Sequence, residues 1–191
     1  MADMVQFCKG LGGPRAMPKK TINLHMLALL GLILIACETS GVSLNMGLNS
    51  GFKGKYLSAR NALENGSYPK AVRSYQSLLK SSGPLEARVR LEYAHSLLRA
   101  DRFSEAFEQA KILADSQTGV ARSTALSVQA TAEHELALTA LANGKRDGTV
   151  KDRLKSAKSA LDEMLKNHKE LDTLGAMAAR RSAIKKALST L

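Results

Sequence analysis

The side chains that most often carry chemistry are sparse in this chain. It has four histidines, which stand far apart in the sequence: His25, His95, His134 and His168. None has a second ligand at a spacing that suits a metal ion. Glu133 and Glu135 flank His134, but adjacent positions of a helix do not face each other, so we expect a solvated His134. Glycine-rich phosphate loops, nucleophile turns and His-Glu-x-x-His helices are also absent from the sequence. The sequence therefore predicts no catalytic site, no metal site and no cofactor.

The two cysteines are the remaining reactive side chains, and Cys37 has the more informative surroundings. Residues 26–36 (MLALLGLILIA) carry no charge, and Lys19 and Lys20 lie shortly before them. A basic segment followed by an apolar one of about 7–15 residues is typical of a secretory signal peptide. A transmembrane helix would need roughly 20 apolar residues. We therefore expect a cleaved signal, with a signal anchor or a buried apolar helix as the alternatives.

The end of this apolar run, residues 34–37 (LIAC), resembles the lipobox of bacterial lipoproteins. The resemblance implies cleavage before Cys37 and acylation of that cysteine. Glu38 follows, whereas an Asp at this place tends to retain enterobacterial lipoproteins in the inner membrane. The resemblance thus favours the periplasmic face of the outer membrane over the inner membrane. Because Cys8 lies in the leader, no disulfide is expected in the mature chain.

Three segments are predicted on this basis: residues 1–36 as leader and signal peptide, 37–51 as the lipidated cysteine and a tether, and 52–191 as a helical domain. The tether is rich in Ser, Gly and Asn, and about 14 such residues reach roughly 20 Å as a flexible coil. We expect initiation at Met17, which would place the lysines at the amino terminus, while initiation at Met1 would only lengthen the basic segment. The helical part is long enough for one domain with a core.

From Phe52 onward the composition favours helices and nothing alternates as a strand would, so the predicted fold class is all-α. Glycine and proline divide the segment into seven expected helices: 52–64, 68–81, 85–101, 103–116, 120–142, 150–167 and 171–189. Pro69 is predicted inside the start of the second helix, and the pair Gly83 and Pro84 beyond its end. Thr149 is the expected N-cap of the sixth helix, with Asp152 in its first turn.

Residues 65–75 and 100–110 form an internal repeat with a spacing of 35 residues. The alignment pairs Tyr68 with Phe103 and Ala71 with Ala106. The repeat resembles the tetratricopeptide repeat (TPR), a pair of antiparallel helices with a period of about 34 residues. The resemblance implies a short α-solenoid of TPR-like helical hairpins.

The resemblance covers residues 53–117. Tyr75 fills a later aromatic position of the family pattern, but Ala110 replaces it in the second repeat, and Arg90 stands where an aromatic often begins the second repeat's core. A longer turn at residues 143–149 breaks the register of the third hairpin. An irregular helical bundle is the alternative fold.

TPR arrays bind partners along the first helix of each pair, and transfer of that spacing gives a candidate groove. Steps of three and four residues keep its members on one face of each helix. The first pair contributes Lys53, Tyr56, Arg60, Leu63 and Glu64, and the second Arg88, Leu91, His95, Leu98 and Arg99. Arg60 and Arg99 are the expected partners for carboxylates of an extended or helical peptide. Leu91 and Leu98 would serve equally well as core residues.

The chain is basic, with a formal net charge of +11. This charge favours acidic partners, and its excess lies between Lys145 and Lys186. That segment has no Phe, Tyr or Trp to stack on single-stranded bases, so nucleic acid is a disfavoured partner.

The resemblances together imply a membrane-anchored, non-enzymatic lipoprotein that binds a protein or peptide partner in the cell envelope. Lipoproteins of this build act as assembly factors for envelope complexes, for example as pilotins of secretin pores. An envelope regulator that recruits a cell-wall enzyme is one alternative. A cytosolic basic helical protein that binds nucleic acid or anionic membrane is the other.

Overall fold

The computed structural model describes residues 50–191, and 84% of these residues are helical, without a strand among them. The all-α prediction is confirmed for this part of the chain. The signal peptide, the lipobox at Cys37 and most of the predicted tether lie outside the described residues.

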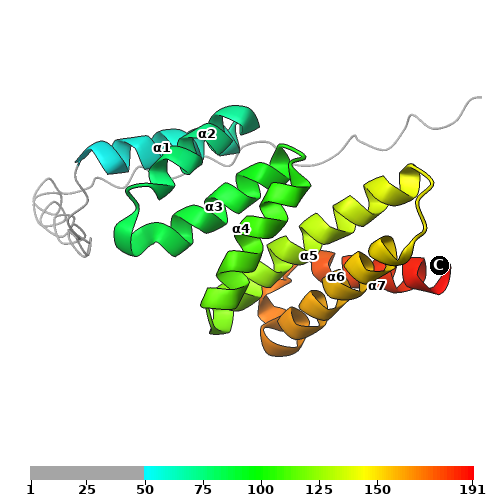
Figure 1. Ribbon diagram of the computed structural model, residues 1–191. Coiled ribbons are helices and arrows are strands. Elements are labelled where there is room, and N and C mark those ends of the chain that lie inside the picture. The colour runs from blue at the N-terminus through cyan, green and yellow to red at the C-terminus, as the bar shows by residue number, and fades with distance from the viewer. Residues whose placement is uncertain (1–49) are drawn as a thin grey trace, which may run out of the picture. The chain divides into compact units, whose positions relative to one another are not determined.

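Seven α-helices follow one another in this part of the chain (Figure 1): α1 (Ser50–Glu64), α2 (Tyr68–Leu79), α3 (Glu86–Arg99), α4 (Phe103–Ser116), α5 (Gly119–Ala142), α6 (Gly148–Asn167) and α7 (Ala176–Ser189). Two short 3₁₀ turns precede α3 and α7: η2 (Gly83–Leu85) and η3 (Lys169–Leu171). The expected bounds of α4 agree with the structure, and those of the other helices differ at one or both ends.

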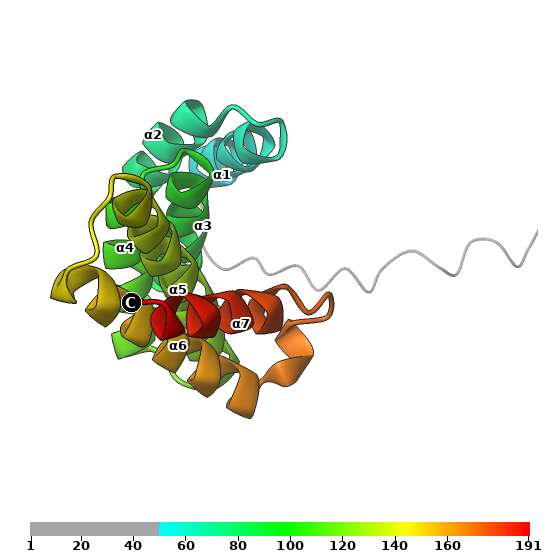
Figure 2. The same cartoon turned by 90° about the vertical axis from the view of Figure 1, so that its right-hand side faces the viewer.

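Each helix packs against the next one along the chain, which gives a row of helical hairpins (Figures 1 and 2). Some contacts skip a neighbour, since α3 touches α5 and α5 touches α7. The short connections explain the antiparallel packing, since turns of a few residues return the chain beside the helix it has just left. In this row, α1 and α7 lie at opposite ends.

The internal repeat marks equivalent places in α2 and α4. Tyr68 and Phe103 are the first residues of these two helices, and Pro69 occupies the first turn of α2 as expected. Ala71 and Ala106, three residues further on, have no exposed surface. A larger side chain at either position would overpack the interior at a typical cost of about 1–3 kcal/mol.

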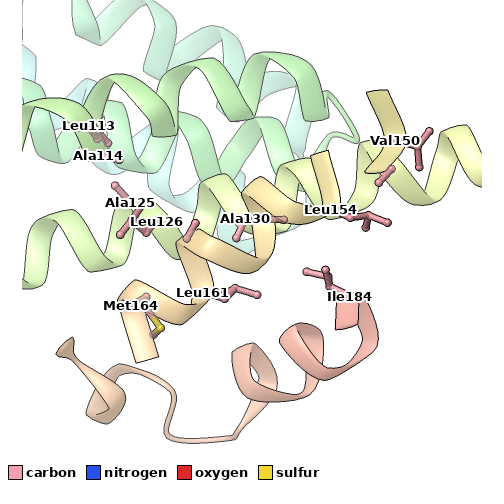
Figure 3. Packing of buried hydrophobic residues seen from close by; sticks show 13 residues of the cluster. Leu113, Ala114, Ala125, Leu126, Ala130, Val150, Leu154, Leu161, Met164 and Ile184 are labelled. Carbon is pink, nitrogen blue, oxygen red and sulfur yellow. The ribbon is translucent and has the colours of Figure 1, made fainter. Parts of the chain in front are cut away.

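The core consists of two main clusters of buried side chains. The first joins α1 to α4 and includes Phe52, Tyr75, Leu78, Val89 and Leu97. The second joins the end of α4 to α5, α6 and α7, and Figure 3 shows Ile184 of α7 pointing toward α6 within it. Its larger members are Leu113, Leu126, Leu154, Leu161, Met164 and Ile184.

The predicted start of α6 is wrong by two residues. The N-cap is Asp147, whose side chain accepts a hydrogen bond from the Val150 N–H at 3.2 Å, and the helix begins at Gly148. Thr149 is therefore inside the helix, and Asp152 lies beyond its first turn. Both Asp and Thr make good N-caps, but the carboxylate also favours the positive end of the helix dipole.

The predicted start of α7 is also wrong, by five residues. Residues 169–171 form the 3₁₀ turn η3, and Gly175 then adopts a left-handed conformation with φ of 69°. Asp172 closes the start of α7 by accepting hydrogen bonds from the Met177 and Ala178 N–H groups, both at 2.9 Å. The apolar spacing of residues 171–177 continues through this turn, which is why periodicity alone placed the helix start too early.

Candidate functional site

The groove residues predicted on α1 and α3 lie next to each other through Tyr56. The Arg88 guanidinium donates a hydrogen bond to the Tyr56 hydroxyl at 3.1 Å and also lies over the ring, 5.9 Å from its centroid. The same hydroxyl donates to the Glu92 carboxylate at 3.5 Å. Tyr56 thus joins the two helices and gives Arg88 a fixed place on their common surface.

Aromatic packing holds the Tyr56 ring in position. The ring stacks on Phe52, with centroids 6.5 Å apart, and meets the edge of Tyr75 at 6.1 Å. Such pairs contribute about 0.5–1.5 kcal/mol each beyond the area that they bury. Of these three side chains, Phe52 and Tyr75 are buried and Tyr56 is half-buried. The Tyr56 hydroxyl can therefore reach the exposed Arg88.

Arg88 and Arg99 form no ion pair with any acid of residues 50–191. Arg99 donates two hydrogen bonds to the Tyr68 hydroxyl, at 2.6 and 3.2 Å, and lies 5.1 Å from the centre of that ring. The two arginines are eleven residues apart, which is roughly 16 Å along a helix. They therefore mark the two ends of a strip on α3.

Arg60 differs from Arg99, although the sequence placed both as carboxylate partners. Arg60 is exposed and forms an ion pair with Glu64 on its own helix at 2.7 Å. The hydrogen bond and the charge of Glu64 raise the pKa of Arg60. A ligand carboxylate would have to compete with Glu64 for this guanidinium, whereas Arg88 and Arg99 bind tyrosine hydroxyls and form no ion pair within residues 50–191.

The leucines of the predicted groove are half-buried. Leu91 packs against the second main cluster and against the small cluster of Ala94, Ala110 and Val128, and Leu98 also packs against that small cluster. Both side chains therefore contribute to the core while part of their surface stays accessible. Between the two arginines, the α3 surface is consequently partly apolar.

His95 and Lys53 are exposed on the same faces. Protein atoms around His95 lower its pKa through desolvation, and the nearby Glu92 carboxylate opposes that effect. We use the name inner strip for the residues Lys53, Tyr56, Arg60, Arg88, Leu91, Glu92, His95 and Arg99.

Glu92 is the member of the inner strip that sequence reasoning missed. It is half-buried, accepts from Tyr56 and acts electrostatically on Tyr75 and Arg60. The sequence does contain one indication of this role: Glu92 lies four residues after Arg88, which puts both residues on the same face of α3. A lone carboxylate among cations was not distinctive enough in the sequence to reveal that role.

The expectation of a solvated His134 is wrong, because this side chain is 6% exposed. Its Nδ1 atom accepts a hydrogen bond from Arg180 of α7 at 2.9 Å, and Arg180 also pairs with Glu135 at 2.8 Å. Burial and the Arg180 charge lower the pKa of His134. The neighbouring contacts explain the difference: α7 covers this face of α5, which the local sequence does not reveal.

Glu133 is buried as well, on another side of α5, with 4% of its surface exposed. One carboxylate oxygen has no hydrogen-bond partner among the described residues. Burial raises the pKa of this carboxyl group, against the lowering effects of Ser156, Arg153 and Lys111.

A separate hollow of about 290 Å³ lies where α5, α6 and the start of α7 meet. Its apolar lining includes Met164, Leu171, Leu174 and Met177, and Leu174 is 93% exposed. Thr124 and Ser127 of α5 supply hydroxyl groups to the same hollow. A second hollow of about 450 Å³ runs along α1 to the start of α2, and its polar lining includes Ser58, Asn61, Asn65 and Ser67.

Within residues 50–191, no group of three or more His, Cys, Asp or Glu side chains lies close enough together to hold a metal ion. The helices of this range all fall short of the length and apolar character that crossing a bilayer requires. Comparison with protein-family models, with curated proteins and with solved structures finds no match for the chain.

Proposed function

We propose that this chain is a lipoprotein, lipidated at Cys37, whose helical hairpins form a short TPR-like α-solenoid that binds another protein in the cell envelope. The role is a non-enzymatic scaffold or assembly factor, tethered to the periplasmic face of the outer membrane. The lipobox-like residues 34–37 support the tether. The repeat spacing of 35 residues, with Tyr68 and Phe103 both opening a helix, supports the TPR-like arrangement.

One observation carries the binding role: two arginines that form no ion pair within residues 50–191 stand at the two ends of the inner strip, each held by a tyrosine. A guanidinium that is already oriented loses less entropy when it forms a bidentate pair with a carboxylate. Leu91 and Leu98 lie between the arginines and keep accessible apolar surface. This combination fits a peptide segment with acidic residues at its ends and apolar residues between them.

Two acids, Glu92 within the inner strip and Glu64 beside it, set a limit on the ligand. Both act electrostatically on Arg60 of α1, so this surface is not uniformly positive. A partner with a continuous acidic run would meet these carboxylates, and like charges would oppose each other. A mixed acidic and apolar segment suits the strip better than a polyanion, which is consistent with a protein partner.

Photo-crosslinking in a bacterial envelope tests this role. A photo-reactive amino acid at His95, in the middle of the strip, should give a discrete crosslinked species, while the same amino acid at the exposed Arg73 of α2 should not. Arg88→Glu should abolish the His95 crosslink, and Arg73→Glu, an equal charge change, should leave it intact. Crosslinks that are equal at both positions, or insensitive to Arg88→Glu, would contradict the proposal.

The identity of the crosslinked protein then decides between two roles. A subunit of an outer-membrane assembly would indicate an assembly factor. A cell-wall hydrolase or synthase would indicate a regulator that recruits an enzyme, with the same strip occupied in both cases.

A further inference from the structure

Five cations meet at one end of the row of helices. Lys145 and Arg146 belong to the loop between α5 and α6, Lys151 to the first turn of α6, and Lys185 and Lys186 to the last turns of α7. Val150 and Leu154 share a buried cluster with Ile184, and Leu188 and Leu191 pack against the same cluster. Figures 1 and 2 both show the carboxyl-terminal end of α7 near the α5–α6 loop. We use the name cationic end for these five residues.

The acids around the cationic end have other partners. Asp147 caps α6, and Asp152 pairs with Lys155 at 3.6 Å. Asp162 binds both Lys158 and Arg181, further along α6. By contrast, the five cations form no ion pair with any residue in the range 50–191. Lys151 is half-buried and the other four are exposed, so the positive charge of this end is directed to solvent.

The form of this surface argues for an extended partner with spread negative charge. Neither of the two hollows described above is lined by any of the five cations. The segment from Lys145 to Lys186 also lacks aromatic side chains on which nucleic-acid bases would stack. Flexible lysine side chains spread over two helix ends instead suit a layer of phosphate groups that can adapt to them.

We propose that the cationic end binds the anionic headgroups of a phospholipid bilayer, so that the protein contacts its membrane at a second place. This inference rests on one part of the proposed function, the lipid tether at Cys37. The tether would enter at α1, and the cationic end lies at the opposite end of the helix row. Two attachments raise the effective concentration of the second one and lay the row of helices along the bilayer. Each Lys or Arg near an anionic surface strengthens attachment about fivefold.

Vesicle binding of the mature chain, residues 37–191 carrying Cys37→Ser, tests this surface without the lipid and without the apolar leader. The chain is mixed with vesicles of phosphatidylcholine alone or of phosphatidylcholine with phosphatidylglycerol, and the bound fraction is measured after flotation. The test variant is Lys145→Gln with Lys185→Gln and Lys186→Gln. The matched control is Lys55→Gln with Lys70→Gln and Lys80→Gln, which removes three exposed cations from α1, α2 and the end of α2.

The expected result is stronger binding to the vesicles with phosphatidylglycerol, weakened about 100-fold in the test variant and much less in the control. Equal weakening of both variants would overturn the proposal, because total charge rather than the cationic end would then explain binding. No preference for phosphatidylglycerol would overturn it too. Release of the chain from these vesicles by an equal phosphate concentration of polynucleotide would assign the surface to nucleic acid instead. The crosslinking at His95 uses no vesicles, so the protein-binding role stands or fails separately.

Discussion

Arg180 of α7 donates a hydrogen bond to Nδ1 of the buried His134 on α5, over a distance of 2.9 Å. Arginine has only donors, so this ring nitrogen must carry no proton. Arg180 also pairs with Glu135 at 2.8 Å, and both partners come from the middle of α5. These contacts hold α7 against α5, with which it has few other contacts. We therefore expect the packing of α7 to depend on Arg180 and on pH.

Replacement of Arg180 should loosen α7. Arg180→Met keeps much of the aliphatic length but leaves the His134 and Glu135 acceptors without a donor, so we expect a loss of about 1–2 kcal/mol in the free energy of unfolding. Arg181→Met is the matched control, since its pair with Asp162 is more exposed and should contribute at most about 1 kcal/mol. Urea unfolding followed by circular dichroism measures both. Equal losses in the two variants would show that Arg180 has no special role.

The pKa of His134 predicts a loss of stability in mild acid. Burial and the Arg180 charge lower this pKa from the ordinary value of 6.5, so the unfolded chain binds the proton more readily than the folded one. The contribution is fully present above pH 6.5 and is lost as the pH falls through that value toward the lower folded pKa. The facing groups are Arg180 and Glu135, and the Glu135 charge weakens the effect.

The variant His134→Gln tests this dependence, because the amide offers Arg180 an acceptor that does not titrate. Its melting temperature should fall less than that of the unmodified chain between about pH 7.5 and about pH 5. The two curves should converge toward the acidic end. Parallel curves over the whole range would place the titration elsewhere in the molecule.

Tyr75 is fully buried, and its hydroxyl has no hydrogen-bond partner among the described residues. Tyr75→Phe removes that oxygen and keeps the ring that packs on Tyr56, so the free energy of unfolding should stay the same or rise by about 1 kcal/mol. Tyr75→Ala, which empties the same space, should cost about 3–5 kcal/mol. A clear destabilisation by Tyr75→Phe in thermal or chemical unfolding would reveal a partner for the hydroxyl.

Replacement by alanine should change the stability in opposite directions at two glycines. Gly54 lies inside α1 with open space where a Cβ would be, so Gly54→Ala should stabilise the protein by about 0.5–1 kcal/mol. Gly66 has φ of 73° in the turn between α1 and α2, and Gly66→Ala should cost about 1 kcal/mol. Melting temperatures should shift in opposite directions. A shift in the same direction would show that backbone conformation does not decide the effect at these two glycines.

The helices themselves could be predicted from the sequence, because glycine and proline lie at most of the turns and the segments between them are long. Both repeat helices begin at the predicted aromatic residues, Tyr68 and Phe103. The helix starts that were predicted wrongly are those of α6 and α7, which depend on side-chain caps by Asp147 and Asp172. Several neighbouring residues have similar capping ability. Local sequence cannot choose among them, since the choice depends on how the next helix packs.

The environments of single residues could be predicted less well. The burial of His134 depends on α7, which begins more than forty residues later, and no local pattern indicates that contact. The binding of Arg99 to Tyr68 likewise joins α3 to the start of α2. By contrast, the shared face of Arg88, Leu91 and His95 follows from helical spacing alone. Most of the inner strip could therefore be predicted from the sequence.

We propose that the mature protein is a lipid-tethered helical scaffold that begins at Cys37. The most direct test is the intact mass, with membrane fractionation, of the chain expressed in a bacterium beside its Cys37→Ser variant. We expect a membrane-bound protein whose mass equals an acylated chain starting at Cys37, and a variant without that modification. An unlipidated chain that retains Met1 or Met17 would contradict it.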